Sequence, residues 1–117
     1  MNYIDGMVCA VPTASKAAYL RYAQDLAALF KDHGALQVTD TWGDDVPEGK
    51  LTSFTMAVKR EEGETVVFSW ITWPSRAARD QGWQKLMADS RMEKFSKAMP
   101  FDGKRMIYGG FEVISQA

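Results

Sequence analysis

The sequence contains one cysteine and one histidine, and it lacks a long hydrophobic run and a marked excess of either charge. Because Cys9 has no second cysteine to pair with, we expect no disulfide within the chain and a reducing, cytoplasmic location. Cys9 and His33 cannot form a zinc site without several carboxylates, so we expect no metal and no cofactor. No apolar segment approaches the ~20 residues of a membrane-spanning helix, and the N-terminus does not resemble a signal peptide, so no membrane partner is expected.

The two kinds of charge are nearly balanced along the chain. Lysine plus arginine total 14 and aspartate plus glutamate total 15, which gives a formal net charge of −1. Proteins that bind nucleic acid usually carry a basic stripe, because much of their affinity comes from neutralising phosphates. No such stripe is present, so we expect no nucleic-acid partner.

The segment at residues 64–73 is the one around which we expect the fold to be organised. It is β-branched or aromatic at nearly every position, and both of its alternating faces are mostly apolar. That pattern is typical of a central strand covered on both sides. Pro74 ends it, because proline cannot donate a hydrogen bond to a neighbouring strand. A length of 117 residues predicts a single domain over residues 1–117.

Periodicity and turn residues predict the other elements. Strands are expected at residues 3–11, 35–42, 64–73 and 105–115, with helices at 13–34 and 75–88 and short helical pieces near 54–58 and after Asp89. Thr13 or Ser15 is expected to cap the first helix, Thr52 or Ser53 the short piece in the long connection 43–63, and Ser75 the helix at 75–88. Gly82 within that last helix indicates close packing, and Gly109 and Gly110 indicate a bulge or a close backbone approach.

The order of elements, β-α-β-β-α-β, predicts an α+β protein with a ferredoxin-like fold and a four-stranded antiparallel sheet. The first and third strands are expected at the centre of the sheet, with the helices on one face only. The opposite face would carry aromatic residues of the central strand together with Tyr3, Met7, Cys9, Met106, Tyr108 and Ile114. An apolar face of this kind is too large to leave in water, and a second copy packed sheet to sheet would cover it, so we expect a homodimer.

Four segments resemble the YbaA-like family of uncharacterised bacterial proteins. They are Tyr3–Gly6, Trp42–Pro47, Val67–Ile71 and Met99–Glu112, and the resemblance covers essentially the whole chain. The resemblance implies a ferredoxin-like fold of the dimeric α/β-barrel type. It supplies no activity, cofactor or catalytic residue.

Asp5 and Glu112 are the first candidates for chemistry. If the first and last strands pair antiparallel, these carboxylates lie roughly opposite each other on the face away from the helices, where one pKa would rise. Arg105 and Tyr108 are close in sequence as partners. The pair would handle a proton or orient a ligand under the dimer interface. The alternative is a structural role at the rim of the sheet.

Aromatic residues supply the other candidates. Trp42 begins the long connection, which would act as a lid over a pocket, or else Trp42 simply ends a strand in the core. Trp70 would line an aromatic pocket or form part of the core. The predicted ligand-binding set comprises Asp5, Met7, Trp42, Trp70, Arg105, Tyr108 and Glu112.

Three functions follow from these expectations. The first is a homodimer that binds a small, largely apolar molecule between its sheet and the partner. The second is a cofactor-free enzyme, similar to monooxygenases or isomerases of dimeric-barrel architecture, with acid-base work by Asp5, Tyr108 and Glu112. The third is a module that binds another protein. A roomy pocket favours the first two, whereas a face filled by partner side chains favours the third.

Overall fold

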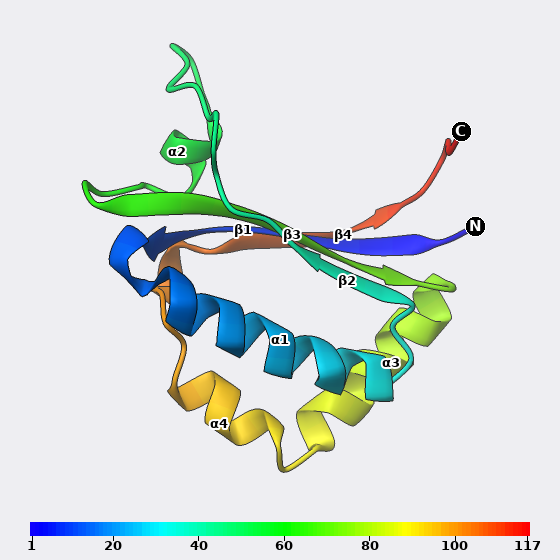
Figure 1. Cartoon of the computed structure of the whole chain (residues 1–117). Coiled ribbons are helices and arrows are strands. Elements are labelled where there is room, and N and C mark those ends of the chain that lie inside the picture. The colour runs from blue at the N-terminus through cyan, green and yellow to red at the C-terminus, as the bar shows by residue number, and fades with distance from the viewer.

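The computed structural model describes all 117 residues, and it consists of a sheet with most of its helices on one face (Figure 1). The strands are β1 (Tyr3–Pro12), β2 (Gln37–Asp40), β3 (Glu64–Trp73) and β4 (Ile107–Glu112). They lie in the order β2-β3-β1-β4, and each neighbouring pair is antiparallel. The predicted α+β, ferredoxin-like arrangement is therefore confirmed, with β1 and β3 at the centre.

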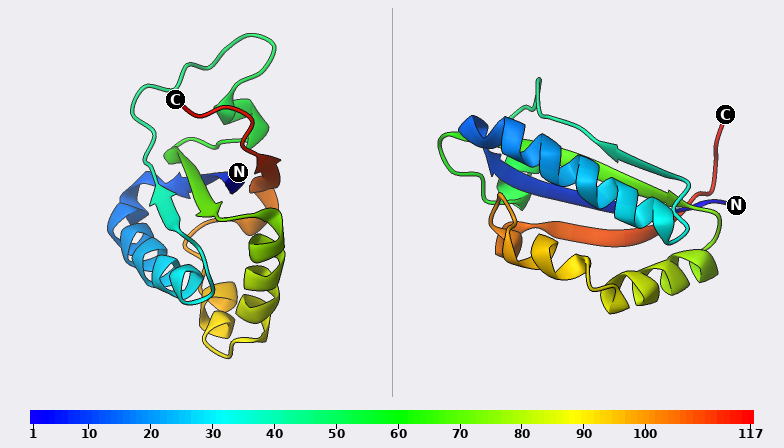
Figure 2. Two further views of the ribbon diagram at one scale, coloured as in Figure 1. Left: turned by 90° about the vertical axis from the view of Figure 1, so that its right-hand side faces the viewer. Right: turned by 60° about the horizontal axis from the view of Figure 1, so that its bottom comes forward.

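The helical elements lie on both sides of the sheet, but unequally. Below the sheet in Figure 1 are α1 (Lys16–Asp32), α3 (Arg76–Ala88) and α4 (Met92–Lys97), while α2 (Phe54–Ala57) lies above it. Short turns of 3-10 helix occur at Thr13–Ser15 and Gly103–Arg105. In Figure 2 the layer below the sheet is formed by α1 and α3 on either side, with α4 at its base.

Two of the predicted helix caps are present and one is not. The Ser53 hydroxyl accepts from the Met56 amide at 3.1 Å, and the Ser75 hydroxyl accepts from the Ala78 amide at 3.0 Å. At the start of α1, however, no side chain caps the helix. The Thr13 hydroxyl instead hydrogen-bonds that of Thr65 at 2.7 Å, because the turn before α1 lies against the start of β3.

The prediction of which residues face away from the helices was right for Ile114 and for aromatic residues of the central strand, but wrong for the others. Tyr3 and Cys9 are 8% and 4% exposed and lie in clusters with residues of α1. The register pairs Met7 with Tyr108, which puts Tyr108 on this helix-facing side as well. Since both alternating faces of β1 are apolar, the sequence pattern could not decide between them. The face of β1 that meets the helices is determined by side-chain contacts with those helices.

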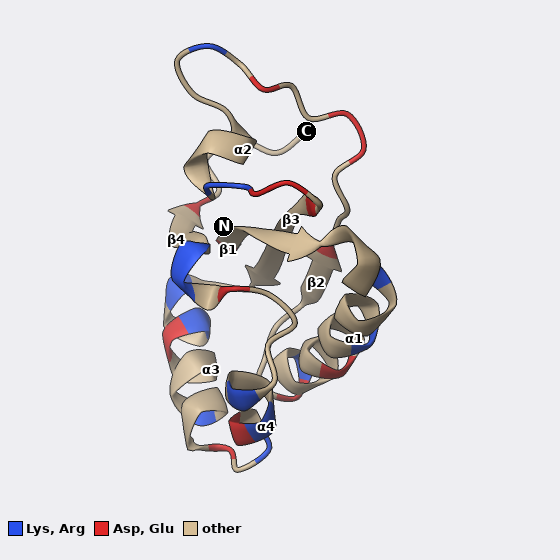
Figure 3. Ribbon diagram, turned by 90° about the vertical axis from the view of Figure 1, so that its left-hand side faces the viewer, with Lys and Arg blue, Asp and Glu red and all other residues tan.

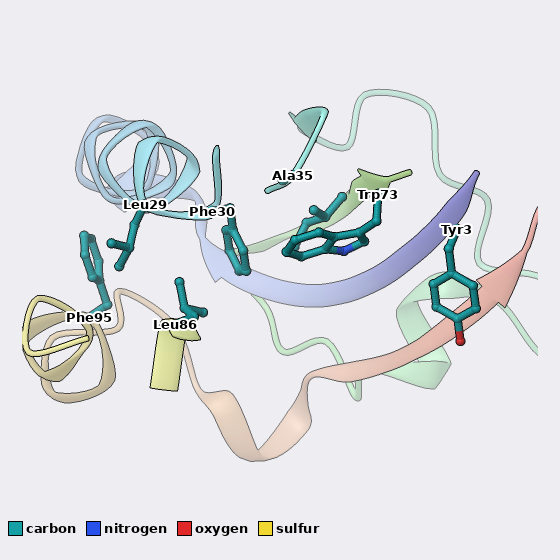
Figure 4. Close-up of a cluster of buried hydrophobic side chains, with 8 residues drawn as sticks. Tyr3, Leu29, Phe30, Ala35, Trp73, Leu86 and Phe95 are labelled. Atoms are coloured by element: carbon teal, nitrogen blue, oxygen red, sulfur yellow. The ribbon is translucent and has the colours of Figure 1, made fainter. Parts of the chain in front are cut away.

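The main core cluster lies between the sheet and the helices and is centred on Trp73, which is fully buried (Figure 4). Phe30 of α1 meets the Trp73 ring edge-on, with centroids 6.3 Å apart. A Cβ atom on Gly82 would collide with the Trp73 ring and lie 2.8 Å from the His33 carbonyl oxygen. The close packing predicted for Gly82 is therefore confirmed, because α3 approaches β3 at this position.

The face away from the helices is covered at one end only. There Val58, from the connection between β2 and β3, is fully buried and forms a cluster with Val8, Ala10 and Val66. The rest of this face carries exposed apolar side chains, notably Phe68, Ile107, Phe111 and Ile114. We call this remaining area the open face.

The edge strands β2 and β4 are shorter than predicted. β2 spans four residues, although the Leu36 amide, before it, still donates to the Thr72 carbonyl at 2.7 Å. Positive and negative side chains are interspersed over the helices and connections (Figure 3). No helix is long and apolar enough to cross a membrane.

Candidate functional site

A partly enclosed cavity of about 250 Å³ lies between the sheet and the helices. Its walls come from β1, β2 and β3 on one side and from α1, α3 and α4 on the other. The apolar residues that line it are Met7, Tyr22, Ala23, Leu26, Ala27, Phe30, Val38, Ile71, Trp83, Met92, Phe95, Met99, Phe101 and Met106. A drug-sized ligand usually occupies a pocket of roughly 300–1,000 Å³, so this cavity suits a smaller molecule.

One wall of the cavity is polar, where β2 and β3 lie side by side beneath α1. Asp40 is the only charged residue of the lining. The Tyr19 hydroxyl donates to Asp40 Oδ1 at 3.2 Å, and the Ser69 hydroxyl donates to the same oxygen at 2.8 Å. Both hydroxyls thus hold one oxygen of the carboxylate. We call Tyr19, Asp40 and Ser69 the polar wall.

The other titratable groups of the lining are held protonated. Burial, followed by the nearby charge of Asp40, raises the pKa of the Cys9 thiol to about 12. The same two effects, in the same order, raise the pKa of Tyr19. Because a thiol must ionise to act as a nucleophile, Cys9 contributes here as a small buried side chain rather than as a reactive group.

Asp5 does not face Glu112, and this prediction was wrong. Asp5 pairs with Gly110 across the β1–β4 ladder, whereas Glu112 pairs with Tyr3. The error is a shift of register, since antiparallel pairing was predicted without a defined turn to fix it.

Asp5 is instead a buried acceptor that ties α3 to the sheet. Its Oδ2 atom accepts from the indole nitrogens of Trp73 at 2.9 Å and Trp83 at 2.8 Å. Arg79 Nε donates to Oδ1 at 3.0 Å, and Arg79 Nη2 lies 3.0 Å from the same oxygen. Hydrogen bonds with Asp5, and then with Asp80, raise the pKa of Arg79. With every lone pair engaged, Asp5 has no free capacity for a substrate.

Of the two glycines in β4, Gly110 is the one that close contacts require. A Cβ atom there would collide with the Tyr3 hydroxyl and lie 2.8 Å from Arg79 Nη2. The close backbone approach predicted for this glycine pair is thus present. The β1–β4 register runs without a bulge through Gly109 and Gly110.

The other predicted site residues fall into two groups. Met7, Trp70, Tyr108 and Glu112 line a groove of about 770 Å³ on the open face and its β4 edge. Trp42 and Arg105 lie elsewhere. The Trp42 ring packs 6.3 Å from that of Tyr19, and Arg105 forms an ion pair of 2.8 Å with Glu64. Only Met7 of the predicted set reaches the enclosed cavity.

The polar wall was not predicted, although the sequence carried a signal for it. Asp40 shares its strand face with Val38, and Ser69 shares its face with Val67 and Ile71. A polar residue on an otherwise apolar strand face marks a hydrogen-bonding site, and here that site joins the buried Ser69 to the exposed Asp40. Nowhere do three or more His, Cys, Asp or Glu side chains gather closely enough to hold a metal ion.

The topology and the cavity define a ferredoxin-like α+β protein with a hollow between its sheet and its helices. Residues 2–103 match the sequence model of the family described as "Protein of unknown function (DUF1428)", and the chain belongs to this family. It is 58% identical over 114 residues to the uncharacterized protein YbaA of Escherichia coli strain K12, which covers 97% of both chains. The YbaA protein of Shigella flexneri matches with the same identity and coverage.

One solved structure shows the same fold at low sequence identity. It is SnoaB, a cofactor-independent oxygenase from Streptomyces nogalater, with a TM-score of 0.58 and 13% identity, over 98% of this chain and 95% of that one. At this identity the likeness concerns the fold alone.

Proposed function

We propose that the protein binds a small, largely apolar molecule in the cavity between its sheet and helices, and that it does so as a homodimer joined through the open face. The observation that carries the proposal is the cavity itself, whose lining is apolar apart from a few convergent polar groups. Such a lining is typical of small-molecule sites, where apolar contacts bind the ligand and a few hydrogen bonds orient it.

The groove on the open face is larger, but it is a weaker candidate for the ligand. It lies over Phe68, Trp70 and Phe111, two of which are exposed aromatic residues. Exposed apolar groups of this kind favour a protein partner over a small molecule, because a flat face cannot surround a ligand. A second copy is the partner that the fold type favours, and its sheet would cover these residues.

A cavity-filling variant tests the binding site. Ala27 lines the cavity from α1, while its neighbour Ala28 is exposed. Ala27→Phe is expected to weaken the binding of naphthalene, used as a neutral probe, by roughly tenfold or more, whereas Ala28→Phe leaves it unchanged. Isothermal titration measures both affinities, and circular dichroism checks that both variants fold. Equal affinities for the two variants would contradict the proposed site.

A second candidate is a cofactor-free enzyme, and the observation that favours it is the Asp40 carboxylate on the cavity wall. A carboxylate beside an enclosed apolar space is suited to removing a proton from a bound molecule. The shared fold with a cofactor-independent oxygenase adds support at the level of analogy only. Oxygen uptake with hydroxylated naphthalenes as probes, absent in Asp40→Asn, is the expected result. Uptake that is unaffected by Asp40→Asn would rule out this role.

A further inference from the structure

The polar wall leaves one hydrogen-bond acceptor unused at the edge of the cavity. Tyr19 and Ser69 both donate to Asp40 Oδ1, whereas Oδ2 of Asp40, an exposed residue of the lining, accepts no hydrogen bond from the chain. An ionised carboxylate has about four lone-pair sites, so the free oxygen can take a further donor. A bound molecule with an O–H or N–H group would supply it.

The Tyr22 hydroxyl provides an unused donor in the same cavity. Its ring lies 6.2 Å from that of Tyr19 and 5.7 Å from that of Phe95. Its hydroxyl is accessible to solvent and forms no hydrogen bond within the chain. Burial, then the nearby Cys9 and Asp40, raise the pKa of Tyr22, so the group remains a protonated donor at neutral pH. The cavity therefore offers a ligand one acceptor and one donor.

The size and lining of the cavity restrict the body of the ligand. An apolar protein cavity of about 150 Å³ is sufficient for benzene. The volume here, about 250 Å³, is larger and leaves room for a body of the size of two fused rings. The rings of Tyr22, Phe30, Trp83 and Phe95 all line this space, and aromatic faces and edges bind other rings favourably.

We propose that the ligand is an aromatic molecule with a hydroxyl group that donates to Asp40 and accepts from Tyr22. This inference rests on the proposed function, since it concerns the same cavity. A hydroxyl both donates and accepts, whereas an ammonium group cannot accept from Tyr22. A carboxylate on the ligand is excluded because it would meet the charge of Asp40 in a cavity with no cationic side chain in its lining.

A series of naphthalenes that differ in one substituent tests the hydroxyl requirement. Naphthol, methoxynaphthalene and naphthoate, substituted at the same ring carbon, are compared with naphthalene by isothermal titration at neutral pH. Naphthol is expected to bind roughly tenfold or more tightly than methoxynaphthalene, which accepts but cannot donate, because a hydrogen bond to a charged group contributes at least this much. Naphthoate is expected to bind most weakly.

Variants of Asp40 and Tyr22 test whether these two side chains cause the preference for naphthol. Asp40→Asn and Tyr22→Phe are each expected to remove most of the preference for naphthol over methoxynaphthalene while leaving the affinity for naphthalene unchanged. Asp44→Asn is the matched control for Asp40→Asn, because the Asp44 side chain is exposed and lies outside the cavity lining. Ser69→Ala is expected to reduce the same preference in part, through the loss of one donor to Asp40.

The outcomes separate the ligand class from the site. If naphthol and naphthalene bind equally and Ala27→Phe weakens both, the hydroxyl requirement is refuted and the cavity stands as the binding site. If none of the series binds to the intact protein, the site and the ligand class both fail. If naphthol is preferred and Asp40→Asn and Tyr22→Phe keep that preference, the assignment to these residues is refuted.

Discussion

Replacing Asp5 should destabilise the protein far more than replacing another carboxylate bound to the same arginine. The side chain of Asp5 is 8% exposed and accepts from Trp73, Trp83 and Arg79. In Asp5→Asn, the new amide nitrogen must face either the two indoles or the guanidinium, so at least one group of donors loses its acceptor. Removing one partner of a buried ion pair costs about 3–5 kcal/mol, and leaving a buried donor unpaired costs about 1–3 kcal/mol. We expect a loss of about 3–5 kcal/mol.

Asp80→Asn is the matched control for this prediction. Asp80 lies 2.9 Å from Arg79 Nη1, but its side chain is 54% exposed. Exposed ion pairs contribute about 0–1 kcal/mol, so this variant should unfold at nearly the same urea concentration as the parent protein. Urea titration at neutral pH, followed by tryptophan fluorescence and circular dichroism, measures both free energies of unfolding. Equal losses for the two variants would refute the view that Asp5 is the buried tie between α3 and the sheet.

Three further predictions concern packing, pH and assembly. Gly82→Ala should lower the free energy of unfolding by about 1–3 kcal/mol, and with it the midpoint of thermal unfolding, because the added methyl collides with the Trp73 ring. An unchanged or higher midpoint contradicts this. Hydrogen bonds from Arg105 lower the pKa of Glu64 from 4.5 to about 2. The contribution of Glu64 to folding stability is therefore present above pH 4.5 and is lost as the pH falls toward 2. Glu64→Gln should flatten the plot of unfolding free energy against pH in that range, and an unchanged slope would disprove the linkage. On the open face, Phe111→Lys should yield a monomer in sedimentation at micromolar concentration, while Met87→Lys, equally exposed on α3, keeps the mass of the parent protein; a monomeric parent rejects the dimer.

The order and type of the main elements could be predicted because each depends on local signals. The run of β-branched and aromatic residues in β3 and the Ser75 cap of α3 both act within a few residues of the chain. The ferredoxin-like topology follows from that order. Strand lengths were less predictable, because the ends of β2 and β4 depend on which neighbouring strand remains within hydrogen-bonding distance.

The candidate site was harder to predict, because it depends on which strand face meets the helices. Both faces of β1 are apolar, and the side that carries Asp5 is fixed by its contacts with Trp83 and Arg79, more than 70 residues further along the chain. Once the wrong face was assigned, Asp5 was expected in a pocket on the face away from the helices, but it does not line the groove on that face. Asp40 was overlooked because it is an exposed acid in a short edge strand, and only its hydrogen bonds with Tyr19 and Ser69 place it at the cavity wall.

The methionine methyl groups provide the most direct test of the cavity as a ligand site. Of the seven methionines in the chain, Met7, Met92, Met99 and Met106 line the cavity, whereas Met1, Met56 and Met87 are exposed. With the methyl groups labelled with carbon-13, titration of naphthol should shift the resonances of the four cavity methionines and leave the three exposed ones in place. Shifts confined to Met1, Met56 or Met87, or no shift at Met92 and Met99, would contradict binding between the sheet and the helices.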